Sequence, residues 1–173
     1  MNSAKTRAAI VAALRKIMPA HSILSDAEDT RPYECDALST YKQLPLIVVL
    51  PDNETQIVAI LKICRDFQVP VVPRGAGTGL SGGATPIEHG IVLSTAKLNK
   101  ILELNAYART AKVQPGVRNL AISDAAADAG LYYAPDPSSQ LACTIGGNVA
   151  ENAGGVHCLK YGLTNHNVLR VKI

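Results

Sequence analysis

The chain has 173 residues, a net charge of +3 and 47% hydrophobic residues, enough for one domain, or two small ones, with an aliphatic core. Acidic and basic residues are mixed along it, which excludes the strongly basic surface typical of nucleic-acid-binding proteins. No stretch reaches the roughly 18 apolar residues of a membrane span. The cysteines and histidines are scattered without ligand spacing, so we expect reduced thiols, no metal site and a cytoplasmic protein.

The first 25 residues are basic and contain no acidic side chain. We interpret Ala4–Met18 as a surface helix that ends at Pro19, and an organelle transit peptide is the alternative. Residues 20–45 have no regular pattern. The apolar face of the helix would hold Ala8, Val11, Leu14 and Met18.

A β–α–β unit is predicted next. Leu46–Leu50 is a short apolar run typical of a buried strand. Asn53 then caps a helix with Gln56 as its capping-box partner, and Val69–Val72 forms the second strand. Such a unit should be parallel and right-handed. The apolar face of the helix would hold Ile57, Ile60, Leu61, Cys64 and Phe67.

The remaining elements are shorter. Ile91–Leu93 predicts a third strand of the first sheet, and Ser123–Ala129 predicts an alanine-rich helix with Gly130 just after its end. The other apolar runs predict strands at Ile101–Leu104, Ala111–Gln114, Leu131–Tyr133 and Leu169–Ile173.

The segment Pro73–Pro86 holds five glycines in fourteen residues. Glycine offers positive φ and close approach of the main chain to a ligand, and consecutive N–H groups beside an arginine favour anion binding. No lysine follows, which excludes an ATP-type P-loop. A G-x-G-x-x-G match through Gly77, Gly79 and Gly82 is not followed by a helix. A stand-alone pyrophosphate loop for FAD is therefore favoured over a flexible loop.

A second glycine-rich cluster spans Asp136–Gly155 and carries hydroxyls and amides. Small polar groups on such a backbone suit another wall of a nucleotide site. Asx or Ser turns without a ligand are the alternative for this cluster taken alone.

Five motifs occur in order along the chain: Pro73–Gly79, Pro115–Gly116, Ala134–Ser139, Thr144–Gly155 and Lys160–Gly162. This pattern is similar to the FAD-binding domain of the vanillyl-alcohol-oxidase type, also called the PCMH type. Within it, the chain most resembles the FAD subunit of bacterial glycolate oxidase and related D-lactate and D-2-hydroxyglutarate dehydrogenases. The resemblance covers about residues 36–173.

The resemblance implies an α+β fold with two lobes, one a small parallel β–α–β lobe and the other a mostly antiparallel α/β lobe. Residues 1–45 would form the N-terminal helix and leader, 46–100 the first lobe with the pyrophosphate loop, and 101–173 the second lobe. Because members of the family are longer, we expect a C-terminally truncated domain whose catalytic groups lie outside this chain.

The resemblance also implies which residues hold FAD. The first loop would wrap the diphosphate, with Arg74 either neutralising the phosphates or bracing the loop. Several relatives attach FAD covalently through a histidine where this chain has Thr78, so non-covalent FAD is expected. His157 and Tyr161 lie near a motif, and we expect structural roles for both. The predicted cofactor residues are Arg74, Gly75, Ala76, Gly77, Thr78, Gly79, Leu80, Ser81, Pro115, Gly116, Pro135, Asp136, Pro137, Ser138, Ser139, Thr144, Ile145, Gly146, Gly147, Asn148, Glu151, Asn152, Ala153 and Gly154.

The implied activity is oxidation of a small 2-hydroxy acid, such as glycolate or D-lactate, by hydride transfer to FAD. The resemblance implies sister flavin and iron–sulfur subunits as partners. The alternatives are a flavoenzyme of the same fold with another substrate, such as an ether-lipid synthase or an enolpyruvyl reductase, and a non-catalytic nucleotide-binding fragment.

Overall fold

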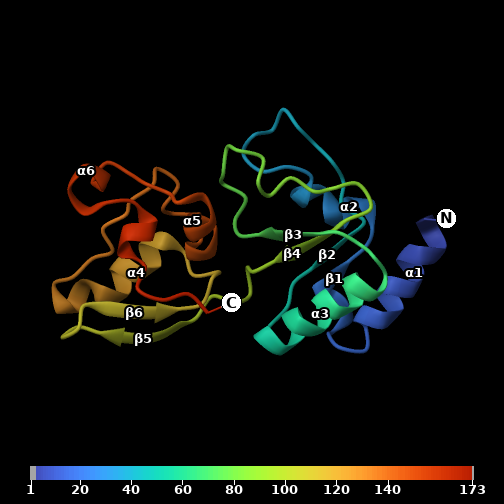
Figure 1. Ribbon diagram of the computed structural model, residues 1–173, viewed down its shortest axis with the longest axis horizontal. Helices are drawn as coiled ribbons and strands as arrows, with labels where there is room; N and C mark the ends of the chain where they lie inside the picture. The colour runs from blue at the N-terminus through green and yellow to red at the C-terminus, as the bar shows by residue number, and fades with distance from the viewer. Residues whose placement is uncertain (1–2, 173) are drawn as a thin grey trace. The chain divides into compact units, whose positions relative to one another are not determined.

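A computed structural model describes residues 3–172 of the chain. The chain divides into two compact units at the bond between Lys97 and Leu98 (Figure 1). Residues 1–97 are called unit 1 below and residues 98–173 unit 2, and each is described by itself. Within residues 3–172, no helix is long and apolar enough to cross a membrane.

Unit 1 is built on a four-stranded sheet with the order β1-β2-β4-β3. Strands β2 (Ile47–Val49), β3 (Val71–Arg74) and β4 (Ile91–Ser94) are parallel, and β1 (Ile23–Leu24) runs antiparallel to β2. The predicted parallel sheet is confirmed, with β4 lying between the two strands of the β–α–β unit. β1 was not predicted, because two residues leave no pattern to recognise.

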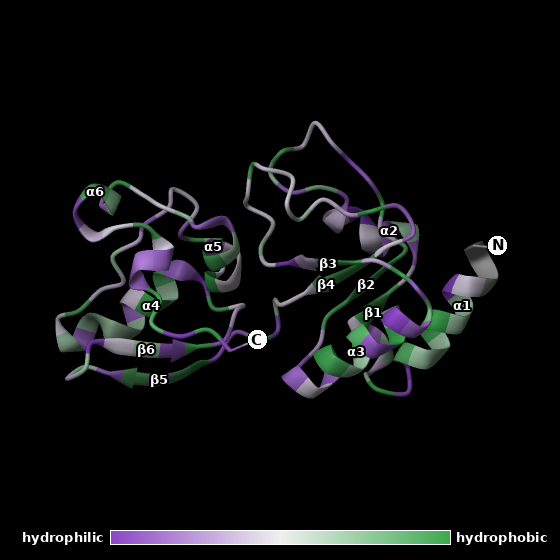
Figure 2. Ribbon diagram, in the orientation of Figure 1, coloured by the Kyte–Doolittle hydropathy of each residue, from purple (hydrophilic) through white to green (hydrophobic). Residues whose placement is uncertain are grey.

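The core of unit 1 lies between the sheet and two helices, α1 (Ser3–Leu14) and α3 (Glu54–Asp66). Alternate residues of β2 and β4 point into it, since side chains along a strand alternate between its faces. Figure 2 shows the hydrophobic colouring gathered on the strands and on α3. The fully buried members include Ile10, Leu14, Ile47, Val49, Ile60 and Ile91.

Helix α3 begins as its sequence predicts. The Asn53 side chain accepts a hydrogen bond from the Gln56 N–H at 2.9 Å, and the Gln56 side chain accepts one from the Asp52 N–H at 2.7 Å. The reciprocal cap satisfies two N–H groups that have no partner within the helix. Gln56 reaches one residue further back than a standard capping box requires.

Two predicted apolar positions are wrong in unit 1. Ala8 is exposed, and Ile10 takes its place beside Leu14. Leu61 is 46% exposed, because it lies one residue round the helix from the fully buried Ile60. The first helix also ends at Leu14 rather than at Met18, although Met18 is buried.

The segment of unit 1 that leads to β2 contains short turns of helix besides β1. These are a 3₁₀ turn at Ala20–Ser22, α2 (Ala27–Thr30) and a 3₁₀ turn at Arg31–Tyr33. Downstream, the Ala37 N–H donates to the Gly79 carbonyl at 3.0 Å. The leader is thereby fixed against the glycine loop that follows β3.

Unit 2 begins with the antiparallel hairpin of β5 (Ile101–Asn105) and β6 (Thr110–Val113), which confirms the predicted second sheet. Helix α4 (Asn119–Ala126) and a 3₁₀ turn (Ala127–Ala129) follow, and Gly130 closes them at φ 67°. This helix starts four residues earlier than predicted. The later elements are α5 (Ile145–Glu151), α6 (Cys158–Tyr161) and a 3₁₀ turn at Thr164–Asn167.

Two of the strand predictions in unit 2 are wrong. The Leu131 N–H donates to the Ala126 carbonyl at the end of α4, and the Tyr133 N–H donates to the Ser123 hydroxyl. These N–H groups are therefore not available to a sheet. Residues 169–172 also form no strand, since none of the described strands pairs with them. Ile173 lies outside the described residues.

Candidate functional site

The glycine loop of unit 1 starts at Arg74, the last residue of β3. The Arg74 side chain is only 8% exposed. Its Nη1 donates to the Cys35 carbonyl at 2.8 Å, and its guanidinium lies 5.5 Å from the centre of the Tyr33 ring. Burial lowers the pKa of the Arg74 guanidinium, and the nearby Cys35, Tyr33 and Asp36 oppose that shift. The geometry favours the bracing role over direct phosphate contact.

Gly77 fits the loop to this arginine. Its φ of 73° is rarely adopted by other residues, and a Cβ there would overlap the Arg74 guanidinium. The loop backbone therefore runs directly over the buried cation. Gly82 also has positive φ, at 77°.

The N–H groups of the loop form the candidate anion cradle. Among residues 3–172, those of residues 75–79 donate no hydrogen bond to a carbonyl or side chain. A run of main-chain N–H groups over a positive charge is suited to bind a diphosphate. Leu80 and Ser81, the last two residues of the predicted segment, are both exposed, and Leu80 is 72% exposed.

In unit 2, the Pro115–Gly116 turn packs on the first turn of α5. The Gly146 N–H donates to the Pro115 carbonyl and the Ile145 N–H to the Val117 carbonyl, both at 2.8 Å. A Cβ on Gly146 would lie 2.8 Å from the Pro115 Cβ. Gly146 is thus required for close packing of the helix against the turn. The sequence did not indicate that this glycine pair lies within a helix.

Two buried amides connect the predicted cofactor segments of unit 2. The Asn148 Nδ2 donates to the Asn119 Oδ1 at 2.8 Å, and the Asn119 Nδ2 donates to the Pro135 carbonyl at 3.0 Å. Asn119 is fully buried and Asn148 is 3% exposed. Sequence analysis missed Asn119, because nothing in its neighbourhood marks a polar residue as buried.

Asp136, a predicted cofactor residue, contacts His157. Its carboxylate accepts from the His157 N–H at 3.1 Å and lies 2.6 Å from the His157 Nδ1. The His157 N–H is the main cause that holds the pKa of Asp136 below its ordinary value. A Cβ on Gly155 would overlap Asp136. The carboxylate is thereby committed to a contact within unit 2, which fits the structural role expected of His157.

The segment Glu151–Gly154 packs against the end of unit 2. Asn152 has φ 50° and accepts from the Asn165 N–H at 3.0 Å. The Ala153 carbonyl accepts from the Thr164 hydroxyl at 2.7 Å, and Gly154 lies close to Leu163. These contacts shape the turn after α5.

The hydrogen-bond donors of the candidate site are suited to a phosphorylated cofactor. The Thr144 hydroxyl is buried without a hydrogen-bond partner at the start of α5, and such a group is commonly completed by a ligand or water. Asp136, the carboxylate that would oppose a phosphate in unit 2, is paired with His157. Among the described residues, no three His, Cys, Asp or Glu side chains gather as a metal site.

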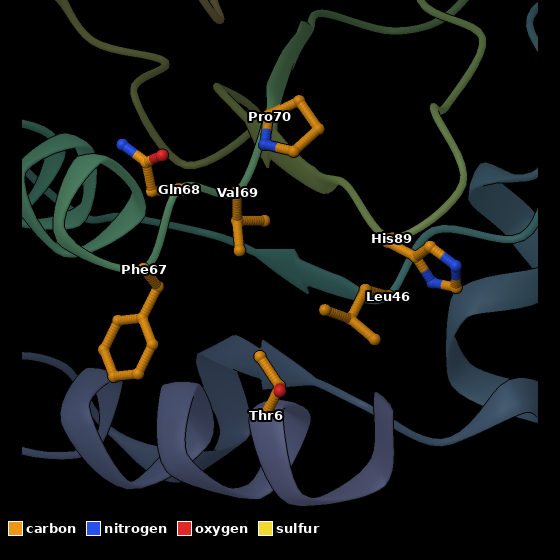
Figure 3. A pocket seen from close by; sticks show the side chains of 7 residues that line it. All are labelled: Thr6, Leu46, Phe67, Gln68, Val69, Pro70 and His89. Carbon is orange, nitrogen blue, oxygen red and sulfur yellow. The ribbon is translucent and has the colours of Figure 1, made fainter. Parts of the chain in front are cut away.

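One depression of about 210 Å³ lies elsewhere in unit 1 (Figure 3). Thr6 projects into it from α1 and Phe67 from the end of α3. It is mostly apolar and contains no residue of the glycine loop, so it is not the candidate cofactor site. The other lining residues are Leu46, Gln68, Val69, Pro70 and His89.

Several known proteins are similar to the chain. It is 60% identical over 167 residues to the glycolate oxidase subunit GlcD of Escherichia coli (strain K12), which covers 96% of the chain and 34% of that protein. It is 47% identical over 126 residues to a D-lactate dehydrogenase of Archaeoglobus fulgidus, covering 73% of the chain and 28% of that protein. The chain thus spans about a third of the length of these curated relatives.

Solved structures share the fold at low identity. An alkyldihydroxyacetonephosphate synthase aligns with a TM-score of 0.79 at 22% identity, over 90% of the chain and 34% of that protein. A p-cresol methylhydroxylase aligns with a TM-score of 0.77 at 20% identity, over 86% of the chain and 30% of that protein. The predicted PCMH-type fold is confirmed. Residues 45–173 match the model of the FAD binding domain, and the chain belongs to that family.

Proposed function

We propose that the chain is the FAD-binding part of a flavin-dependent oxidoreductase that oxidises a small 2-hydroxy acid of the glycolate or D-lactate type. The observation that carries the proposal is the row of N–H groups at residues 75–79 above the buried Arg74 guanidinium. The 60% identity to a glycolate oxidase subunit supports the substrate class.

FAD, when bound, would accept the hydride from the substrate. The residues of this chain would bind and orient it. The N–H groups of residues 75–79 would hold the diphosphate, and the Thr144 hydroxyl would complete its hydrogen bonding on a cofactor oxygen. The domain would comprise the leader at 1–45, the lobe at 46–100 and the lobe at 101–173, with catalytic groups outside it.

FAD would be held without a covalent bond. Thr78 occupies the loop position where the resemblance places an attaching histidine, and a threonine hydroxyl is a weak nucleophile without an adjacent base. The expected location is the cytoplasm, which the four free cysteines support. Sister flavin and iron–sulfur subunits are the partners proposed for the longer protein.

Cofactor binding is tested first on the purified chain. Its visible spectrum is recorded, and FAD and ADP are then titrated by calorimetry. We expect flavin absorption and release of all flavin into the supernatant after acid precipitation. Flavin that stays with the precipitate would contradict non-covalent binding.

Loop variants then assign the site. Gly77→Ala should abolish binding of both ligands, while Gly83→Ala, in the same loop but without positive φ, should bind both. If wild-type chain with a normal far-ultraviolet circular dichroism spectrum bound neither ligand, the proposed function would be wrong for this chain. The substrate class is tested in the longer protein by reduction of its flavin with glycolate and D-lactate.

A further inference from the structure

We propose that Asn119 is a positioning residue for the cofactor: its buried amide holds the Pro135–Ser139 segment against α5 in the geometry that binds FAD. The proposal rests on the proposed function and adds a residue that lies outside every motif of the resemblance. Asn119 is the first residue of α4 and is fully buried.

The hydrogen bonds fix the direction of the amide chain. A carbonyl oxygen can only accept, so Asn119 must present its Nδ2 to the Pro135 carbonyl, at 3.0 Å. Its Oδ1 then faces Asn148, whose Nδ2 must donate, at 2.8 Å. One arrangement of both amides satisfies all three residues.

The backbone of Asn119 adds a further connection. Its N–H donates to the Cys143 carbonyl at 3.0 Å, directly before Thr144. The next residue, Leu120, donates to the Gln140 carbonyl at 3.1 Å. The start of α4 is therefore bonded to the segments on both sides of Ser139 and to α5.

The contact of Asp136 with His157 also holds the Pro135–Ser139 segment, but it joins the segment to the start of α6 and not to α5. The fully or nearly buried apolar side chains described in unit 2 are Leu98, Val117, Ile122, Ala126 and Cys143. None of these can replace a lost amide bond, and the Pro135 carbonyl would be left without its donor. A shift of the Pro135–Ser139 segment away from α5 is the expected result.

The experiment compares Asn119→Ala with wild type and with Ile122→Ala. Ile122 lies on the same helix and is 5% exposed, so its truncation costs stability through packing alone. Three quantities are measured on the purified chain: the melting temperature without ligand, the Kd of FAD by calorimetry, and the visible circular dichroism of the flavin at saturating FAD.

We expect Asn119→Ala to raise the Kd of FAD about tenfold or more, as loss of a buried hydrogen bond does. It should also change the dichroism of the bound flavin, which reports the geometry around it. Ile122→Ala should lower the melting temperature and leave both the Kd and the saturated spectrum unchanged. Asn119→Ser, which keeps one polar group, should fall between wild type and Asn119→Ala, and it decides the question if Asn119→Ala does not fold.

Two results would overturn the proposal. One is a wild-type Kd and flavin spectrum in the folded Asn119 variants. The other is an equal rise in the Kd for Ile122→Ala at equal loss of melting temperature, which would show a stabilising role only. If wild type bound no FAD, the proposed function itself would fail, and the positioning role of Asn119 with it.

Discussion

The two units hold their glycine-rich loops in different ways. Unit 1 encloses an aliphatic core between its sheet and two helices, and it shapes one glycine loop around a single buried cation, Arg74. Unit 2 has fewer buried apolar side chains among its described residues and joins its loops through Asn119 and Asn148. The loop of unit 1 is held to the leader at Arg74 and at the Gly79 carbonyl, whereas the loops of unit 2 are held to one another by buried amides.

This difference predicts how the stability of each unit responds to mutation. In unit 1, damage to the loop should leave the core intact, because apolar packing supplies most of its stability. In unit 2, the loss of a buried hydrogen bond should affect the fold and the predicted cofactor segments together. The following changes test that distinction.

Arg74→Ala should have the largest effect. It removes a charged donor from the Cys35 carbonyl and should lower the free energy of unfolding by about 2–3 kcal/mol. Because the guanidinium braces the loop, the loss should be present without any ligand. Urea unfolding of the ligand-free chain measures it.

Arg74→Lys provides the matched control. Lysine keeps the charge but lacks the planar fork that faces Cys35 and the Tyr33 ring, so it should recover less than half of the lost stability. A variant that unfolds like wild type yet binds FAD weakly would instead assign Arg74 to direct phosphate contact.

Gly77→Ala should have a similar effect, because it disturbs the same contact. An alanine at a φ of 73° is strained by about 1–2 kcal/mol, and its Cβ would displace the Arg74 guanidinium. Unfolding should remain a single transition, with Gly83→Ala close to wild type. If Gly77→Ala kept full stability, the contact of the loop with Arg74 would not have the importance assigned to it.

The sequence predicted the parts of the molecule that depend on local patterns. Asn53 and Gln56 mark the start of α3, and the apolar runs mark β2 and β4. Both glycine clusters stand out by their local composition, and glycine is needed wherever φ is positive or the backbone must approach closely. The strand predicted at Leu131–Tyr133 is absent, because the N–H groups of Leu131 and Tyr133 donate to residues of α4.

The tertiary contacts could not be predicted in the same way. Nothing in the sequence around Asn119 separates a buried amide from an exposed one, because its partners lie 16 and 29 residues away. The helical state of Gly146 likewise depends on Pro115, which packs against it from a distant turn. Only the fold brings these residues together.

Asp136→Asn tests the loop contacts of unit 2 by their pH dependence. The His157 N–H lowers the pKa of the Asp136 carboxyl, so the stabilisation is present above the ordinary aspartate pKa of about 3.9 and lost as the pH falls below it. The difference in unfolding free energy between wild type and Asp136→Asn should therefore shrink between about pH 5 and pH 3. Titration with urea at each pH measures it.

The His157→Ala variant separates the two donors of that contact. It removes the imidazole and keeps the backbone N–H, which is the larger cause of the lowered pKa of Asp136. A measurable part of the pH dependence should therefore survive in His157→Ala. Its complete loss would show that the imidazole, and not the backbone, holds the carboxylate.

The smallest expected effect is a difference in labelling rate between two buried cysteines, one in each unit. Cys64 is 2% exposed in unit 1 and Cys143 is 3% exposed in unit 2, and burial raises the pKa of the Cys64 thiol to about 11. With Cys35 and Cys158 replaced by serine, labelling of either thiol requires local opening. If apolar packing makes unit 1 the more stable, Cys143 should label faster than Cys64 in low urea, as peptide mass spectrometry would show. The comparison is repeated at pH 9, where the thiols react faster once opened, and equal opening rates there would remove the distinction between the two units.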